Sequence, residues 1–584
     1  MTQTASRPVA TIRARVHRSA LKRVTKFWAS RPIEIFTEVL QNSRRAGATR
    51  VHVTVDTLAK PASRAPEPSE PRLAVTVTDD GSGIGDPAVL LSFGENGWSD
   101  EMVAREDAAG MGILSLAHRG CRISSRPRTP DSRSGQGWSV DLEPEHFTGR
   151  SDALVRCDDT APYPSGTAVR FEAAQSADMI RAAIASAARH YPLPVTFEGE
   201  ALERKAFLDG AVHAEAWNGL AFGVCRDRRQ GYMEPDLNFF GLTVPVRLPT
   251  VETVHGGIWS VRADVVDCPR LELILPARRE PVENAFLAEM REAARLAVYR
   301  AMAADSDPRP AFVDWMRARD ADIELPPPPQ VLRPWRPAIA DIDDWHEPPK
   351  PVPAGPDALV MDCDPEPPEA QALWRATELV GMAKRLFEAD RRLEGYEWYD
   401  RLDRVTAIDT EVTDAHGKAW PLRDFPAPQR QREAGTPLPP RPAAIRMALS
   451  VRTAGGSNRT LHLPADLAFA GESWSWVGET LPLVTKGSTL EPHRLAELLR
   501  RGFFSASDDA GADSWETQAM RFDEEALHIA TRLLCSEDSA LELSIAETVR
   551  RELFWLVPQN RTVEISIARP DVRVVLGDPA KATT

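Results

Sequence analysis

The chain has 584 residues, which is long enough for several domains with separate buried cores. Apolar residues make up 42% of it and charged residues 27%, the balance of a globular protein in water. The net charge of −14 argues against broad electrostatic binding to nucleic acid or to anionic lipid. Nucleic-acid binding is therefore not supported overall, and a basic arm at residues 1–30 is the only candidate patch for it.

Cysteine usage and hydropathy indicate the compartment. The six cysteines are scattered and form no CxxC pair, so we expect neither a zinc site nor a disulfide framework. No apolar run has the length of a signal-peptide core or of a membrane span. We therefore expect a cytoplasmic protein with no membrane partner.

Residues 31–200 predict a two-layer α/β sandwich. Apolar residues at helical spacing predict a first helix that ends at Gly47. The elements predicted after it are alternating strands at residues 51–56, 72–79 and 165–173 and a helix near residues 177–190. Residues 86–109 have few apolar anchors and are interpreted as a mobile segment. This order predicts a mixed sheet with helices on one face, within a protein of the α+β class.

The rest of the chain divides by composition. Residues 201–305 predict an α/β middle unit, and residues 371–584 predict a separate α+β C-terminal domain of unknown role. Between them, residues 306–370 are dense in proline and acidic residues, which predicts an extended linker. The middle unit is expected to contain strands near residues 241–248, 258–266 and 270–275 and a helix at residues 285–302. The C-terminal domain is expected to contain helices near residues 372–394, 490–502, 515–535 and 539–556 and strands near residues 444–452, 459–464, 563–568 and 572–577.

One face of the first helix carries side chains of the kinds that activate water and bind metal ions. Glu38 and Asn42 lie one helical turn apart, and Arg45 follows three residues later on the same face. A carboxylate can activate an attacking water and a carboxamide oxygen can bind Mg²⁺, as phosphoryl transfer to water requires. An ordinary solvated helix face would show the same spacing.

The strand at residues 72–79 runs into an acidic, glycine-rich turn. Asp79 ends the strand, and Gly81, Gly83 and Ile84 follow. A buried carboxylate at this position can accept a hydrogen bond from an exocyclic amine such as that of adenine, and the glycines let the backbone approach the base. A tight turn around a satisfied aspartate is the alternative.

Two further glycine segments complete the pattern. Gly110, Met111 and Gly112 precede an apolar segment predicted to be a helix, and backbone N–H groups at a helix start bind phosphate. Gly166 and Thr167 open a later strand, where Thr167 can place a hydroxyl at the pocket edge. In this order the segments predict one pocket that holds and hydrolyses ATP.

The same segments resemble the GHKL ATPases, a superfamily that includes gyrase B, the ninety-kilodalton heat-shock chaperones, histidine kinases and mismatch-repair ATPases. QNSRRAGAT at residues 41–49 is similar to ENSxDAGAT of the mismatch-repair members. The family's DxGxGI motif is matched at residues 79–84, its lid box at residues 110–112 and its Gly-Thr pair at residues 166–167. The resemblance covers about residues 20–200 and implies a Bergerat-type fold.

The resemblance implies a role for each matched residue. Glu38 would activate the attacking water, Asn42 would bind Mg²⁺ and Asp79 would hold adenine. Gly110 and Gly112 would form the hinge of an ATP lid made from residues 86–109. The other residues that it places at the nucleotide are Arg45, Ala46, Gly81, Gly83, Ile84, Met111 and Thr167.

Arg45 departs from the family pattern, because the family usually has Asp at this position. A guanidinium there can contact the nucleotide or an acidic neighbour. A weaker resemblance links residues 271–302 to the middle domain of the heat-shock chaperones, where an arginine reaches the ATP γ-phosphate. It implies that catalytic role for Arg279, with Arg278 as an alternative and Asn284 near an assisting residue.

The leading expectation is a slow Mg²⁺-dependent ATPase with the layout of a heat-shock chaperone. ATP would close the lid and favour a homodimer that clamps or remodels an unknown protein client. A non-hydrolysing ATP sensor or scaffold is the alternative, which the guanidinium of Arg45 makes credible. A phosphotransferase of the histidine-kinase type is less favoured, because residues 1–30 leave no room for a helical domain with a phospho-acceptor histidine.

Overall fold

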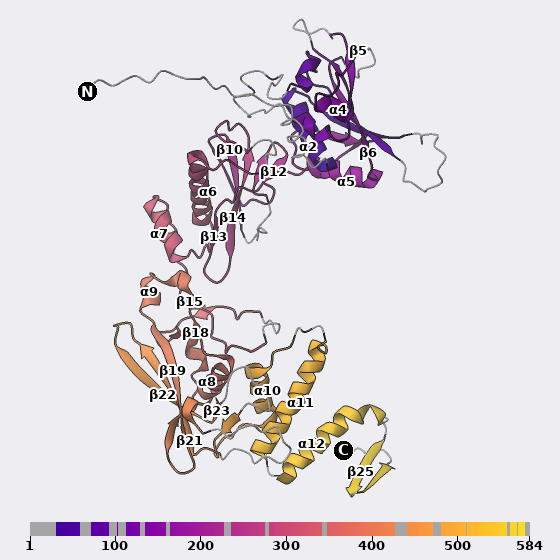
Figure 1. Ribbon diagram of the computed structural model, residues 1–584. Helices are drawn as coiled ribbons and strands as arrows, with labels where there is room; N and C mark the ends of the chain where they lie inside the picture. The colour runs from indigo at the N-terminus through magenta and orange to yellow at the C-terminus, as the bar shows by residue number, and fades with distance from the viewer. Residues whose placement is uncertain are drawn as a thin grey trace, which may run out of the picture. The chain divides into compact units, whose positions relative to one another are not determined.

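The structure is a computed structural model of the chain (Figure 1). It forms two compact units, the first ending at Pro328 and the second beginning at Pro329. Among the described residues, no helix combines the length and the apolar character needed to cross a membrane. The described residues are 31–58, 72–92, 98, 102, 112–128, 135–158, 164–226, 235–274, 280–341, 347–426, 441–470, 481–507, 509, 511–535, 537–557, 561–568 and 570–577.

The N-terminal part of the first unit is built on an eight-stranded sheet with the order β5-β4-β3-β6-β2-β1-β7-β8. β1 runs parallel to β7, and the other neighbours are antiparallel, so the sheet is mixed. Its strands are β1 (Val51–Thr57), β2 (Leu73–Asp79), β3 (Cys121–Arg126), β4 (Trp138–Leu142), β5 (Val155–Cys157), β6 (Gly166–Ala173), β7 (Val195–Phe197) and β8 (Glu200–Ala201).

Helices α2 (Pro32–Arg45) and α5 (Ala177–Ala188) pack on each other and share one apolar core with this sheet (Figure 1). Phe36 of α2, for example, meets Phe171 of β6 edge to face. The opposite face of the sheet is polar, and there Arg170 donates to Asp56 across 2.7 Å. The predicted α+β class, with helices on one face of a mixed sheet, is confirmed.

The segment after Gly112 differs from the predicted α-helix. It forms only a 3-10 helix, η3 (Gly112–Leu116), and then turns through Gly120 into β3. Gly120 has φ +74°, and a Cβ there would lie 2.6 Å from the Leu142 carbonyl oxygen, so the chain reverses before a longer helix can form. Within the expected lid, a short 3-10 helix, η2 (Pro87–Leu90), is described, and most of residues 93–111 lie outside the described residues.

The middle part of the first unit has a second mixed sheet, with the order β12-β11-β14-β10-β9 and β13 paired to β14. Its strands are β9 (His213–Trp217), β10 (Leu220–Arg226), β11 (Leu237–Phe239), β12 (Leu242–Val244), β13 (Thr250–Glu252) and β14 (Ile258–Val265), and its helices are α6 (Ala285–Ala303) and α7 (Phe312–Asp320). α6 packs on the sheet and matches the predicted helix. The strand predicted at residues 270–275 is wrong over its described part, where Leu273 makes only an isolated bridge to Pro281.

The second unit has a mixed sheet with the order β18-β17-β19-β21-β22, and β20 pairs with β19. The strands of this unit are β15 (Val331–Leu332), β16 (Val352–Pro353), β17 (Leu359–Met361), β18 (Leu386–Glu388), β19 (Asp403–Thr413), β20 (Ala419–Pro421), β21 (Ala444–Arg452), β22 (Asn458–Ala465), β23 (Leu467–Ala470), β24 (Leu481–Val484), β25 (Thr562–Ala568) and β26 (Asp571–Gly577). Its α-helices are α8 (Pro367–Leu379), the short α9 (Glu397–Asp400), α10 (Pro492–Phe503), α11 (Trp515–Leu534) and α12 (Glu537–Glu552). In the first unit, α4 spans Pro144–Phe147.

Residues 306–370 are not the extended linker that the sequence predicted. They contain α7 and β17, and β17 lies inside the sheet of the second unit, parallel to both β18 and β19. Leu359 and Met361 lie in a proline-free stretch, residues 357–364, and are buried in the core of that unit. Proline content predicted an extended chain here, but a short apolar segment was sufficient to enter the sheet.

The helix predicted at residues 372–394 is also shorter than expected. α8 begins at Pro367 and ends at Leu379, and Gly381 follows with φ +69°. This left-handed glycine ends the helix, and the chain then enters β18.

Replacing Leu359 tests whether this segment belongs to a core. Leu359→Ala should destabilise the second unit by about 2–5 kcal/mol, because a buried leucine leaves a cavity. The matched control is Val352→Ala, since Val352 is 40% exposed, and it should change stability by less than about 0.5 kcal/mol. Urea unfolding of both variants measures the difference, and equal stabilities would contradict the placement of β17.

Candidate functional site

The start of η3 lies directly on the face of α2 that carries Glu38 and Asn42. A Cβ built on Gly112 would lie 2.6 Å from Glu38 Oε2 and 3.4 Å from Asn42 Nδ2. A side chain at residue 112 would therefore require the Glu38 carboxylate, the end of a flexible side chain, to move. The structure therefore brings together Glu38, Asn42 and Gly112, as the sequence predicted, whereas Gly110 and Met111 lie outside the described residues.

Asp79 lies at the end of β2, beside α2, and is 6% exposed. Its Oδ1 accepts a hydrogen bond from the Gly81 N–H at 2.9 Å, and its Oδ2 accepts one from Ser43 Oγ at 3.1 Å. Burial raises the pKa of the Asp79 carboxyl, and the bonds from Gly81, Ser43 and the Thr167 backbone only partly offset it. A carboxylate has about four acceptor sites, so Asp79 can accept a further bond from a ligand.

The pKa of the neighbouring Asp80 is shifted in the opposite direction. It accepts hydrogen bonds from Thr49 N at 2.7 Å, from Thr49 Oγ1 at 2.6 Å and from Arg50 N at 3.2 Å. Burial acts to raise the pKa of Asp80, but these bonds and the charge of Arg50 outweigh it and lower the pKa. Asp80 thus holds the loop after α2 in place, and Asp79 is the carboxylate available to a ligand.

The glycines of the turn are required because other segments of the chain pack closely against its backbone. A Cβ on Gly81 would lie 2.8 Å from Ala46 Cβ, and a Cβ on Gly83 would lie 2.2 Å from the Arg126 carbonyl oxygen. Gly83 also has φ +67°, which favours glycine. Ala46 accepts a hydrogen bond from the Ser82 N–H at 2.8 Å, so the turn is anchored to the end of α2.

Thr167 and Ile84 meet at a residue that sequence reasoning missed, Ser125 of β3. Thr167 pairs with Asp79 on one side and with Ser125 on the other, and the two hydroxyls lie 3.1 Å apart. Ser125 Oγ also accepts the Ile84 N–H at 2.8 Å. Ser125 follows no motif, so only the register of the sheet reveals it.

Arg45 contacts the side chain that was predicted to bind magnesium. It is 8% exposed, and its Nη1 donates to Asn42 Oδ1 at 3.4 Å. Among the described residues, no group of three or more His, Cys, Asp or Glu side chains could hold a metal ion. Because the Asn42 oxygen is directed at a guanidinium, the described residues do not fit Mg²⁺ in the predicted way.

The helix that carries the site is tied to the middle sheet through Gln41, a second residue that the sequence analysis missed. Gln41 is buried, and its Nε2 donates to the carbonyl oxygens of Phe240 at 2.8 Å and Phe239 at 3.3 Å. Arg44 lies over the Phe240 ring, 3.9 Å from its centroid. These contacts join α2 to the turn between β11 and β12.

Of the residues expected from the middle unit, only Asn284 lies among the described residues. Arg278 and Arg279 lie outside the described residues. Asn284 is described, and its Oδ1 accepts the Leu287 N–H at 2.9 Å, so its side chain caps the start of α6.

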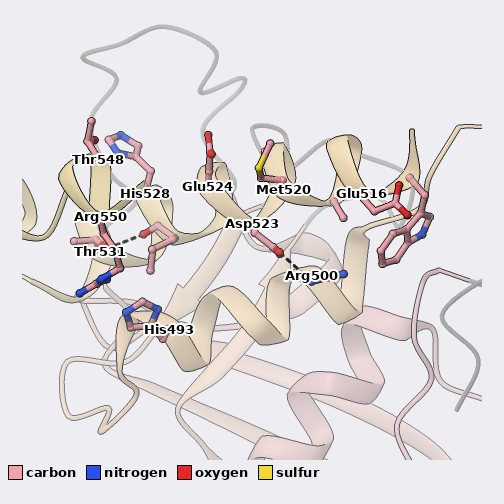
Figure 2. A pocket seen from close by; sticks show the side chains of 13 residues that line it. His493, Arg500, Glu516, Met520, Asp523, Glu524, His528, Thr531, Thr548 and Arg550 are labelled. Atoms are coloured by element: carbon pink, nitrogen blue, oxygen red, sulfur yellow. Dashed lines mark hydrogen bonds and ion pairs between the residues drawn. The ribbon is translucent and has the colours of Figure 1, made fainter. Parts of the chain in front are cut away.

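A separate groove of about 730 Å³ lies in the second unit, between α10 and α11 with residues of α12 at its edge (Figure 2). Figure 2 shows Arg500 of α10 paired with Asp523 of α11, and Nη1 and Oδ2 lie 2.9 Å apart. His493 and Glu524 also line it, so its lining carries both signs of charge. This mixture points to no one class of ligand.

No protein-family model matches the chain, and no curated protein matches it. Similar solved structures include the B-subunit of DNA gyrase from Myxococcus xanthus, with a TM-score of 0.28 and 14% identity over 45% of this chain and 87% of that chain. They also include the N-terminal domain of a DNA repair protein, with a TM-score of 0.20 and 10% identity over 36% of this chain and 65% of that chain. Both TM-scores are too low to carry a functional argument. Neither protein is described as a heat-shock chaperone, so that closer resemblance stays a prediction.

The opposite pKa shifts of Asp79 and Asp80 predict opposite pH effects on stability. The folded-state pKa of Asp79 is raised above 3.8, so its ionisation costs stability as the pH rises through that raised value. Asp79→Asn should therefore gain stability relative to wild type between about pH 4 and about pH 7. The pKa of Asp80 is lowered below 3.8, so the stability that its ionisation contributes develops below about pH 4, and Asp80→Asn should lose stability relative to wild type as the pH rises toward that value. Urea unfolding of Asp79→Asn at about pH 4 and pH 7, and of Asp80→Asn at about pH 2.5 and pH 4, measures both differences, and shifts of the same sign would contradict this account.

Proposed function

We propose that residues 31–200 bind ATP and hydrolyse it slowly, with Glu38 as the residue that activates the attacking water. The observation that carries this proposal is the approach of Gly112 to Glu38 and Asn42. It supports a phosphate site in which backbone N–H groups, a carboxamide and a carboxylate lie within reach of one another.

The adenine end of the nucleotide is assigned to Asp79. Its buried carboxylate keeps acceptor capacity after its bonds to Ser43 and Gly81. An exocyclic amine is a donor that this carboxylate can satisfy, and its low exposure would make the bond strong.

The chemical step assigned to Glu38 is proton removal from water. The water oxygen attacks the γ-phosphorus, the bond from that phosphorus to the bridging oxygen breaks, and ADP leaves with the bridging oxygen. Glu38 accepts the proton of the water, and such general-base assistance contributes about 10²–10⁴ in rate.

Nucleotide binding would act on the middle sheet through α2. Gln41 is one residue from Asn42 and bonds to the backbone of Phe239 and Phe240. A small displacement of α2 on ATP binding would therefore also displace the turn between β11 and β12. A protein client, ATP-dependent homodimerisation and clamping of the chaperone type are part of the same proposal.

A non-hydrolysing ATP sensor is the second candidate. The contact of Arg45 with Asn42 favours it, because it occupies the oxygen that would otherwise bind the metal used in phosphoryl transfer. ATP binding without turnover by the wild-type chain would select this candidate.

Replacing Glu38 tests the hydrolytic role. Glu38→Gln should bind ATP like wild type and lose turnover by about 10²-fold or more, because an amide cannot accept the proton. Glu34→Gln is the matched control on the same helix, since Glu34 pairs with Arg31 at 2.9 Å in the first turn. Phosphate release and ATP binding are measured for both variants. Turnover by Glu38→Gln at the wild-type rate would remove Glu38 from the mechanism.

Replacing Asp79 tests base recognition. Asp79→Asn should weaken ATP binding by about tenfold or more, because a hydrogen bond to a charged acceptor is worth about 1.5–3 kcal/mol. Binding of GTP, which has a carbonyl where adenine has the amine, should change little. Titration with both nucleotides provides the comparison, and equal losses for ATP and GTP would indicate a general structural effect instead.

A further inference from the structure

Arg45 determines which end of the Asn42 amide faces the rest of the site. An arginine side chain has donors and no acceptor, so only the oxygen of Asn42 can face it favourably. The structure has this orientation, with Oδ1 at 3.4 Å from Arg45 Nη1. The amide nitrogen is then the end near Gly112, 3.4 Å from its Cβ position. The two contacts agree on one orientation of the amide.

This orientation places a hydrogen-bond donor where the predicted magnesium ligand should be. Mg²⁺ takes oxygen ligands, and the NH₂ group of a carboxamide cannot serve as one. Rotating the amide would direct Nδ2 at the guanidinium, which sets two donors against each other.

The positive charge of Arg45 also disfavours a metal ion at Asn42. Arg45 is 8% exposed, so water screens its charge only weakly. A divalent cation at Asn42 would lie beside this guanidinium and be repelled by it. A phosphate group, in contrast, would be attracted by Arg45 and could accept a bond from Asn42 Nδ2.

We propose that this site binds ATP without requiring Mg²⁺, with the Arg45 guanidinium supplying the positive charge beside the phosphates and Asn42 donating to a phosphate oxygen. This inference rests on the proposed binding of ATP. It makes Arg45 the residue that sets the metal requirement of the site, and it assigns Asn42 to the phosphate instead of to the metal.

The test compares ATP affinity of the full chain in magnesium and in EDTA. The dissociation constants should agree within about threefold, because no metal-bridged contact is lost. Affinity weaker by more than about tenfold in EDTA would overturn the inference and leave ATP binding intact. Absence of binding in both conditions would overturn the proposed function together with the inference, so the two failures are distinguishable.

Variants at Arg45 identify the cause. Arg45→Asp and Arg45→Gln should bind ATP at least about tenfold more weakly in EDTA than in magnesium, because the amide of Asn42 is then able to rotate and offer its oxygen. Circular dichroism establishes that each variant is folded, and the neutral Arg45→Gln covers the case in which a buried carboxylate prevents folding.

The matched control is Arg44→Gln, which removes the same charge from the neighbouring position of the same helix. Arg44 lies over the Phe240 ring, 3.9 Å from its centroid, and its removal should leave the ratio of the two affinities unchanged. A ratio near one for both Arg45 variants, or an equal change for Arg44→Gln, would overturn the assignment to Arg45.

Discussion

The contact of Gly112 with α2 is the constraint on which the candidate site depends. With a hydrogen in place of a side chain, the chain can begin η3 directly against Glu38 and Asn42. Any Cβ at this position would lie 2.6 Å from Glu38 Oε2, so a larger residue would move either the glycine segment or the carboxylate. Without a side chain at residue 112, the Glu38 carboxylate can keep the position that it has in the structure, beside the Gly112 backbone.

α2 meets three different environments along one turn. Gln41 is directed to the middle sheet, Asn42 to the glycine segment and Ser43 to Asp79. Gln41 and Ser43 are buried and each has a hydrogen-bond partner, as burial of polar groups requires. The consequence is that a rotation or shift of α2 changes all three contacts together. Since helices in a close-packed core move as units, α2 is the element through which the site and the middle sheet can affect each other.

Local patterns were predicted well from the sequence, and contacts between distant segments were not. α2 and β2 follow from the apolar spacing of their own residues, and the approach of Gly112 to Glu38 follows from a motif order. Ser125 could not be found, because its role comes from pairing β3 with β6. The linker prediction failed for a related reason. Composition described the prolines correctly, but the strand at Leu359 exists because β18 and β19 lie on either side of it.

Arg45 shows why a motif can predict a site and still mislead about its chemistry. The residues around it match the pattern that implied magnesium at Asn42, and the single change from Asp to Arg alters what that amide can do. A carboxylate at this position would accept from Asn42 Nδ2 and leave Oδ1 for a metal, whereas a guanidinium takes Oδ1 and leaves Nδ2. With arginine at this position, Asn42 therefore presents a hydrogen-bond donor to a nucleotide instead of an acceptor, without any movement of its backbone. In a buried setting this reversal is costly to undo, because two donors would then face each other.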